Sequence, residues 1–276
     1  MHLVIQGADV ATPDLKHLAK LSGATRIERL TPEAFRLRDA RPAEGIVHAC
    51  EQAQLDYAFV PETRRLDAFR LLVMDMDSTL ITIETIDELA DMVGLKPKVA
   101  AITAQAMRGE IEYDESLERR VALLAGLEET ALDRVYDERL KLTPGAEKLL
   151  AAVKRHGIKT LLVSGGFTRI TERLKPRLGL DFTYANTLET RGGKLTGKVA
   201  GRIVNADGKR DELIRAREAL AIERSQIIAI GDGANDLKFM AEAGVSIAYH
   251  AKPVVRQQAT HALTHVGLDG ALNLFN

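Results

Sequence analysis

The chain has 276 residues and 46% apolar side chains, enough for one large domain or two modest domains with a substantial core. Its 38 basic and 39 acidic residues give a net charge of -1, and no dense basic run occurs along the chain. This balance, together with the absence of tryptophan, argues against a nucleic-acid partner. We therefore expect a globular protein that acts on something smaller.

The sequence also argues against a membrane partner. No apolar stretch reaches the ~20 residues of a membrane-spanning helix, and the first ten residues, MHLVIQGADV, lack the basic and apolar regions of a signal peptide. We therefore expect a cytoplasmic protein. Cys50 is the only cysteine, so no intrachain disulfide can form, and its spacing from Ile46 and Ala53 predicts packing on an apolar helix face.

Residues 1–66 predict a small α+β domain of alternating short strands and helices. The expected strands are HLVIQG, FRLR and DYAFV, and the expected helices are DLKHLAKLSG and EGIVHACEQAQ. PETRRLD, with its proline and mixed charges, is the expected linker.

From residue 69 onward the pattern changes to longer apolar strands that end in acidic or glycine-rich turns and are separated by helices. The four strands are FRLLVMDMD, IKTLLVSGG, QIIAIGDGAND and VSIAYHA. Nearly continuous apolar runs of this kind are typical of strands buried on both faces. The prediction for residues 69–276 is therefore an α/β fold with a doubly wound parallel sheet.

Two segments interrupt this alternation. Residues 85–140 contain four helical patterns and no strand, which predicts a helical cap inserted after the first strand. RGGKLTGKVAGRIV, with its spaced glycines, predicts a hairpin off the main sheet.

Polar residues follow three of the four strands. In open parallel sheets, ligands bind beyond the carboxyl ends of the strands, so these residues are expected to converge. They are Asp75 and Asp77 after the first strand, Ser164, Gly165 and Gly166 after the second, and Asp232, Asn235 and Asp236 after the third.

The residue types at these strand ends favour phosphate chemistry. Carboxylates gathered around one crevice repel each other unless a cation binds, and all-oxygen ligands suit Mg²⁺. SGGF opens a helix, so its backbone N–H groups and the Ser164 hydroxyl could hold an anion. A carboxylate can attack phosphorus if positive charge relieves the repulsion, and Lys209 is the candidate for that charge.

These motifs resemble those of the haloacid dehalogenase superfamily: DMDST at 75–79, SGG at 164–166, Lys209, and GDGAND at 231–236. The longer strings DMDSTLITIETIDELA, LVSGGF, ANTLE…GKLTG and IGDGANDL are similar to those of phosphoserine phosphatases within that superfamily. The resemblance covers residues 69–260.

The resemblance implies a role for each matching residue. Asp75 would be the nucleophile and Asp77 the general acid and then the general base. Mg²⁺ would be bound by the Asp75 carboxylate, the Asp77 carbonyl and Asp232, with Asp236 orienting them. Ser164, Gly165 and Lys209 would bind the phosphoryl group, and Asn235 would contact that group or the substrate.

The cap is expected to select the substrate. Arg120 falls on the apolar helical stripe of Leu117, Val121 and Leu124, whereas Arg119 does not, so Arg120 needs a partner such as a substrate carboxylate. The resemblance assigns Arg120 that role and assigns Glu84 the substrate ammonium group. Met107 and Tyr113 are candidates for the apolar side of the pocket. The implied reaction is hydrolysis of phosphoserine in the last step of serine biosynthesis.

Two alternatives stay open at this stage. The enzyme could act on another small phosphomonoester or transfer the phosphoryl group to an acceptor other than water, because these reactions share every motif. The chain could also be a catalytically retired sensor, although complete motifs argue against that. For the N-terminal domain, regulation by a bound amino acid competes with a role in packing or homodimer formation.

Overall fold

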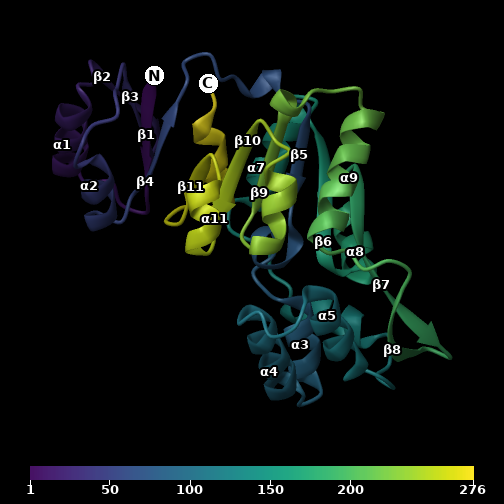
Figure 1. Ribbon diagram of the computed structural model, residues 1–276. Coiled ribbons are helices and arrows are strands. Elements are labelled where there is room, and N and C mark those ends of the chain that lie inside the picture. The colour runs from purple at the N-terminus through teal and green to yellow at the C-terminus, as the bar shows by residue number, and fades with distance from the viewer. The chain divides into compact units, whose positions relative to one another are not determined.

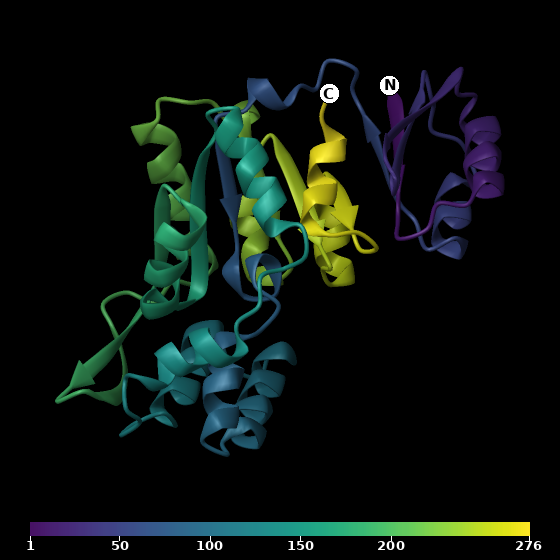
Figure 2. The same cartoon turned by 180° about the vertical axis from the view of Figure 1, so that it is seen from behind.

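The computed structural model describes residues 1–276. They form two compact units, each seen from opposite sides in Figures 1 and 2. The first unit comprises Met1–Leu72, Thr143–Lys159 and Ile222–Asn276, and the second comprises Val73–Leu142 and Thr160–Ala221.

The first unit begins with a four-stranded antiparallel sheet in the order β2-β3-β1-β4. Two helices cover one face of this sheet (Figure 1). Leu3 and Ile5 of β1 and Leu37 of β3 pack there with Cys50, which is fully buried as predicted. The elements are β1 (His2–Gln6), α1 (Thr12–Ser22), β2 (Arg26–Thr31), β3 (Ala34–Arg38), α2 (Ile46–Gln52) and β4 (Asp56–Val60).

Buried polar contacts join this sheet to the C-terminal segment of the same unit. Arg36 donates from Nη2 to the carbonyl of Phe275 across 2.7 Å. The Asp56 carboxylate accepts the backbone N–H groups of Thr264 and His265, each across 2.8 Å. These hydrogen bonds therefore attach the N-terminal sheet to the C-terminal segment.

The remainder of the first unit contains three parallel strands in the order β11-β10-β9 with short helices. Apolar side chains fill these strands, and all five residues of β9 and of β10 are buried, as expected for strands covered on both faces. The elements are α7 (Ala146–Arg155), β9 (Ile227–Gly231), α10 (Leu237–Met240), β10 (Val245–Tyr249), α11 (Pro253–Gln258) and β11 (His261–Leu263).

The second unit combines a sheet with a group of helices. Strand β6 pairs in parallel with β7, and β7 pairs antiparallel with β8. The helix α4 packs against both α3 and α5, and Figure 1 shows the three helices as one group. The elements are α3 (Thr85–Met92), α4 (Lys96–Met107), α5 (Tyr113–Ala122), α6 (Ala131–Arg134), β6 (Lys159–Phe167), α8 (Thr168–Leu178), β7 (Phe182–Arg191), β8 (Lys194–Ala200) and α9 (Ala206–Ala219).

The central sheet has the strand order β11-β10-β9-β5-β6-β7-β8, and the boundary between the units passes through β5 (Leu71–Met74). The predicted α/β class and the four predicted strands are confirmed. The segment predicted as a hairpin supplies the turn and β8, and its partner strand β7 begins before that segment. Strand β7 pairs with β6 through Phe182–Asn186 and with β8 through Thr187–Arg191, so the hairpin extends beyond the residues that pair with β6. The antiparallel β8 makes the sheet mixed and mostly parallel. None of the helices has the length and apolar composition needed to cross a membrane.

Candidate active site

Asp75 and Lys209 form a buried ion pair in the second unit. Asp75 follows β5 directly, and Lys209 lies in the first turn of α9. The Lys209 ammonium lies 2.7 Å from Asp75 Oδ1, and the two side chains are 1% and 8% exposed. Asp75 Oδ1 also accepts the backbone N–H of Met76. A buried lysine is stable only when paired, so this contact holds a charged carboxylate at a defined place beyond the strand.

Asp77 lies in an irregular turn, Met76–Leu80, and is held by the first residue of α3. Thr85 donates its hydroxyl to Asp77 Oδ1 across 2.7 Å and its backbone N–H to Oδ2 across 3.3 Å. Burial, followed by the negative charge of Glu84, raises the pKa of Asp77 to about 7, while the bonds from Thr85 oppose that rise. A carboxyl group with this pKa can both donate and accept a proton near neutral pH.

The structure places Glu84 and Arg120 in the same unit, without an ion pair between them. Glu84 is exposed and accepts the hydroxyl of Ser78 across 2.7 Å. Arg120 is half-buried on α5, and its Nε donates to the carbonyl of Ser116 on the same helix across 3.2 Å. The side chains of Glu84 and Arg120 therefore contact Ser78 and Ser116, not each other. Met107, by contrast, is 66% exposed.

The SGG segment forms the end of β6 just before α8. Ser164 is fully buried, and its Oγ accepts the backbone N–H of Gly166 across 2.8 Å. A Cβ on Gly165 would lie 2.1 Å from the Tyr113 hydroxyl, and one on Gly166 would lie 3.2 Å from Asp77 Oδ2. The two glycines therefore let Tyr113 and Asp77 approach the backbone closely. Burial raises the pKa of Tyr113 to about 12, which keeps its hydroxyl protonated.

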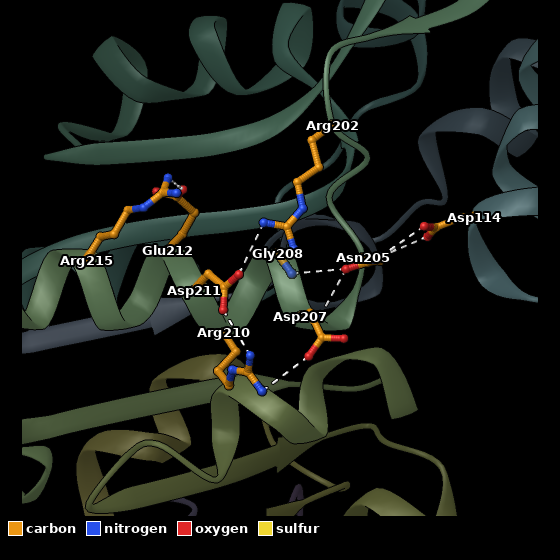
Figure 3. A network of polar contacts seen from close by, with 9 residues as sticks. All are labelled: Asp114, Arg202, Asn205, Asp207, Gly208, Arg210, Asp211, Glu212 and Arg215. Atoms are coloured by element: carbon orange, nitrogen blue, oxygen red, sulfur yellow. Dashed lines mark hydrogen bonds and ion pairs between the residues drawn. The ribbon is translucent and has the colours of Figure 1, made fainter.

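Two asparagines to which the sequence alone assigns no role connect these parts. Asn186 on β7 donates to the carbonyl of Gly165 and accepts the N–H of Val204, both across 2.8 Å. Asn205 precedes α9, and its Oδ1 accepts the N–H of Gly208 across 3.0 Å. Figure 3 shows its amide reaching Asp114 at the start of α5. Asn186 lies in the ANTLE string of the resemblance, and Asn205 is a preferred residue type before a helix, but neither signal identifies the contacts that the side chain makes.

The remaining predicted residues lie in the first unit, in the turn after β9. Asp236 is fully buried, and its Oδ2 accepts the N–H groups of Asp232 and Gly233 across 3.0 and 2.9 Å. Carboxylate oxygens of Asp232 and Asp236 lie within 4.8 Å of each other. A Cβ on Gly233 would lie 2.2 Å from Asn235 Oδ1, so the amide of Asn235 folds over that glycine.

The donor atoms at these strand ends fit a hard divalent cation. Asp75 and Asp236 are buried and Asp232 is half-buried, and all three offer carboxylate oxygens. The predicted site residues include neither histidine nor cysteine, the ligands that favour zinc. One carboxylate oxygen of Asp236 accepts two backbone N–H groups, and these bonds fix the turn that contains Asp232.

Comparison with known proteins shows which family the chain is similar to. Residues 69–244 match the model of the haloacid dehalogenase-like hydrolases, and residues 3–46 match a domain of unknown function, DUF4072. A phosphoserine phosphatase from Polaromonas sp. is 53% identical over 215 residues, which cover 76% of this chain and 91% of that protein.

Two solved structures extend the likeness to three dimensions. The probable phosphoserine phosphatase from Vibrio cholerae, in its unliganded form, is 34% identical with a TM-score of 0.86, covering 99% of this chain and 85% of that one. A phospho-aspartyl intermediate analogue of phosphoserine phosphatase is 35% identical with a TM-score of 0.71, covering 75% of this chain and 99% of that one.

The chain belongs to the haloacid dehalogenase-like hydrolases. Within that family its relatives are phosphatases, and it is an enzyme of that class.

Proposed function

We propose that the enzyme hydrolyses O-phospho-L-serine to L-serine and phosphate through an aspartyl-phosphate on Asp75, in the last step of serine biosynthesis. The observation that carries this proposal is the buried Asp75–Lys209 pair, 2.7 Å apart, in the same unit as Asp77 with its pKa near 7. One carboxylate is held charged by an ammonium group, while the other exchanges a proton near neutral pH. The names of the relatives support phosphoserine as the substrate.

In this mechanism Asp75 Oδ attacks phosphorus, and the bond from phosphorus to the serine oxygen breaks. Asp77 gives its proton to that serine oxygen and later takes a proton from the water that attacks the aspartyl-phosphate. Thr85 keeps the Asp77 carboxyl group oriented through both transfers, because it binds both of its oxygens. The second attack returns Asp75 as a free carboxylate and releases phosphate.

The phosphoryl group would be held by Lys209, Ser164 and the backbone at Gly165, with Asn235 contacting that group or the substrate. Lys209 supplies a fixed positive charge, and the start of α8 supplies backbone N–H groups. These groups offset the repulsion between the incoming phosphate and the Asp75 carboxylate.

The Asp75 carboxylate, the Asp77 carbonyl and Asp232 would hold Mg²⁺, with Asp236 fixing the turn that carries Asp232. Asp75 and Asp232 follow β5 and β9, which are neighbours in the strand order, and their oxygen donors suit this ion. When bound, the ion would neutralise charge on the phosphoryl oxygens.

Glu84 and Arg120 would select the amino acid. The carboxylate of Glu84 would bind the substrate ammonium group, and the guanidinium of Arg120 would bind the substrate carboxylate. Glu84 immediately precedes the cap segment and Arg120 lies within it, and neither charge is used in an ion pair with the other, which supports this assignment.

The experiment is phosphate release from L-phosphoserine with Mg²⁺, with EDTA, and by an Asp75→Asn variant, with Asp91→Asn as the matched control on the exposed face of α3. We expect metal-dependent release that Asp75→Asn abolishes and Asp91→Asn retains. Turnover of other phosphomonoesters with phosphoserine ignored would overturn the substrate assignment. A folded wild-type enzyme that releases phosphate from no ester would overturn the proposal.

Three substrates test the cap residues. Arg120→Gln should raise KM for phosphoserine at least tenfold and leave that for phosphoethanolamine, which lacks the carboxylate, unchanged. Glu84→Gln should raise KM for phosphoserine and phosphoethanolamine but not for 3-phosphohydroxypropionate, which lacks the ammonium group. Arg119→Gln is the control, because Arg119 is exposed and pairs with Glu115 on the helix surface. Equal effects of Arg119→Gln and Arg120→Gln would refute the assignment of Arg120.

A further inference from the structure

Asn186 is a buried amide with both ends in use. It lies on β7 and is 1% exposed. Its Nδ2 donates to the carbonyl of Gly165, and its Oδ1 accepts the N–H of Val204, each across 2.8 Å. Burying an amide is costly unless both of its ends are hydrogen-bonded, so these two bonds fix its orientation.

The first bond determines which end of a peptide group faces Ser164. In a trans peptide, the C=O of Gly165 and the N–H of Gly166 point in opposite directions. Asn186 binds the C=O, and Ser164 Oγ binds the N–H across 2.8 Å. The donor end of this peptide therefore lies on the side of Ser164, and the carbonyl lies on the opposite side.

Nothing in the local sequence enforces this orientation. Gly165 and Gly166 both lack a Cβ, so the backbone here has more accessible conformations than at other residue types. If the peptide rotated, its carbonyl oxygen would replace an N–H on the side of Ser164. A carbonyl dipole there would repel an anion, whereas an N–H attracts one.

The second bond reaches the helix that carries Lys209. Val204 immediately precedes Asn205, whose side chain accepts the N–H groups of Asp207 and Gly208 at the start of α9. By binding the N–H of Val204, Asn186 fixes the backbone where α9 begins. The same amide thus contacts the SGG segment and the chain leading to Lys209, 21 and 18 residues away from it in sequence.

We propose that Asn186 is a positioning residue for phosphate binding. It holds the Gly165 carbonyl away from the phosphoryl group and keeps the start of α9, with Lys209, in register with the SGG segment. This inference rests on the proposed function, since it takes Ser164, Gly165 and Lys209 as the groups that bind phosphate. It adds a residue outside their motifs, one that touches no reacting atom.

Binding of inorganic phosphate tests this inference without turnover. Calorimetric titration of the full chain with phosphate in the presence of Mg²⁺ should give at least tenfold weaker binding for Asn186→Asp and Asn186→Ala than for the wild type. Asn186→Asp keeps an acceptor for Val204 but cannot donate to Gly165, and Asn186→Ala removes both bonds. Product inhibition by L-serine should change less than twofold, because serine lacks the phosphoryl group.

Asn273→Asp is the matched control. It removes a comparable bond, from Asn273 Nδ2 to Gln6 Oε1 across 2.7 Å, in the first unit. It should leave phosphate binding unchanged. Folded Asn186 variants that bind phosphate as the wild type does would overturn the inference, as would equal weakening of phosphate and serine binding.

A measurement on the wild-type protein tests the same inference if the Asn186 variants fail to fold. Hydrogen exchange of the Gly166 and Val204 amides should slow on addition of phosphate, because binding stabilises the segments that Asn186 connects. Unchanged exchange at both amides would overturn the inference. A wild type that binds phosphate but leaves phosphoserine intact would instead overturn the proposed function alone, so the two failures are distinguishable.

Discussion

Asn205 donates its side-chain amide to both carboxylate oxygens of Asp114, at 3.1 Å each. The same side chain accepts the N–H groups of Asp207 and Gly208, so it caps α9 while it contacts α5 (Figure 3). Asp114 is next to Tyr113 on the helix that carries Arg120. The contact thus joins a helix of the cap segment to the helix that carries Lys209.

We expect Asp114→Ala to raise KM for phosphoserine about tenfold with a smaller change in kcat. Hydrogen bonds to a charged group contribute ~1.5–3 kcal/mol, and about 1.4 kcal/mol corresponds to a factor of ten in binding. Losing this contact should loosen the helix that presents Arg120, and steady-state kinetics measures the effect. Glu115→Ala is the control, since Glu115 pairs only with exposed Arg119. The same KM for both variants would contradict a role of Asp114 in holding α5.

The Asp75–Lys209 pair should show strong coupling in stability. Asp75→Asn and Lys209→Met should each lower the free energy of unfolding by about 3–5 kcal/mol, because each leaves a buried charge without the partner it has at 2.7 Å. The double variant should lose at least ~1 kcal/mol less than the sum of the two single losses. Urea unfolding without Mg²⁺ measures all four proteins, and all three variants should lack turnover. Additive losses would show that the pair is not coupled.

The sequence alone predicts the position of residues that lie next to a recognisable strand pattern. Asp75 and Asp232 each follow an apolar strand directly, and Ser164 lies near the end of another, so their positions at strand ends could be predicted. The strand β2 was missed because it is an edge strand with exposed or half-buried residues, and its charged sequence RIERLT lacks a strand pattern.

The supporting contacts could not be predicted, because their partners are distant in sequence. Asn186 reaches Gly165 across 21 residues, and Asn205 reaches Asp114 across 91 residues. The sequence around an asparagine in a strand or before a helix does not reveal whether its amide contacts water or a buried carbonyl. The pKa of Asp77 likewise depends on the burial of its carboxyl group and on the nearby charge of Glu84. Both arise only when the chain folds.

Stability should fall in mild acid because of His261. Its Nε2 lies 2.5 Å from Nη1 of Arg64, which donates to the neutral ring. Burial, followed by the charge of Arg64, lowers the pKa of His261 to about 4, below the ~6.5 of an unfolded histidine. The unfolded chain therefore binds a proton first, so stability is fully present above pH 6.5 and is lost as the pH falls toward 4.

The expected loss over this range is about 3 kcal/mol relative to His261→Gln, which keeps an acceptor for Arg64 but does not titrate. Urea unfolding of both proteins at several pH values between 7 and 4 gives the difference, and all other titrating groups are common to both. A difference that stays constant with pH would mean that His261 is charged in the folded protein.

Asp56 should hold the N-terminal sheet to the rest of the first unit. Its carboxylate is buried and accepts the N–H groups of Thr264 and His265, which lie just beyond β11. In Asp56→Asn one oxygen becomes an NH₂ group, so one backbone N–H faces a donor instead of an acceptor. An unsatisfied buried donor costs about 1–3 kcal/mol, and we expect the free energy of unfolding to fall by that amount while turnover is unchanged.

Asp67→Asn provides the matched control for this prediction. Asp67 is exposed and pairs with exposed Arg65 at 2.8 Å, an interaction that contributes ~1 kcal/mol at most. Deleting residues 1–66 removes both Asp56 and Arg36, so the truncated chain should be less stable than Asp56→Asn while keeping its turnover if folded. If Asp56→Asn and Asp67→Asn unfold at the same urea concentration, the buried contacts of Asp56 do not hold the sheet in place.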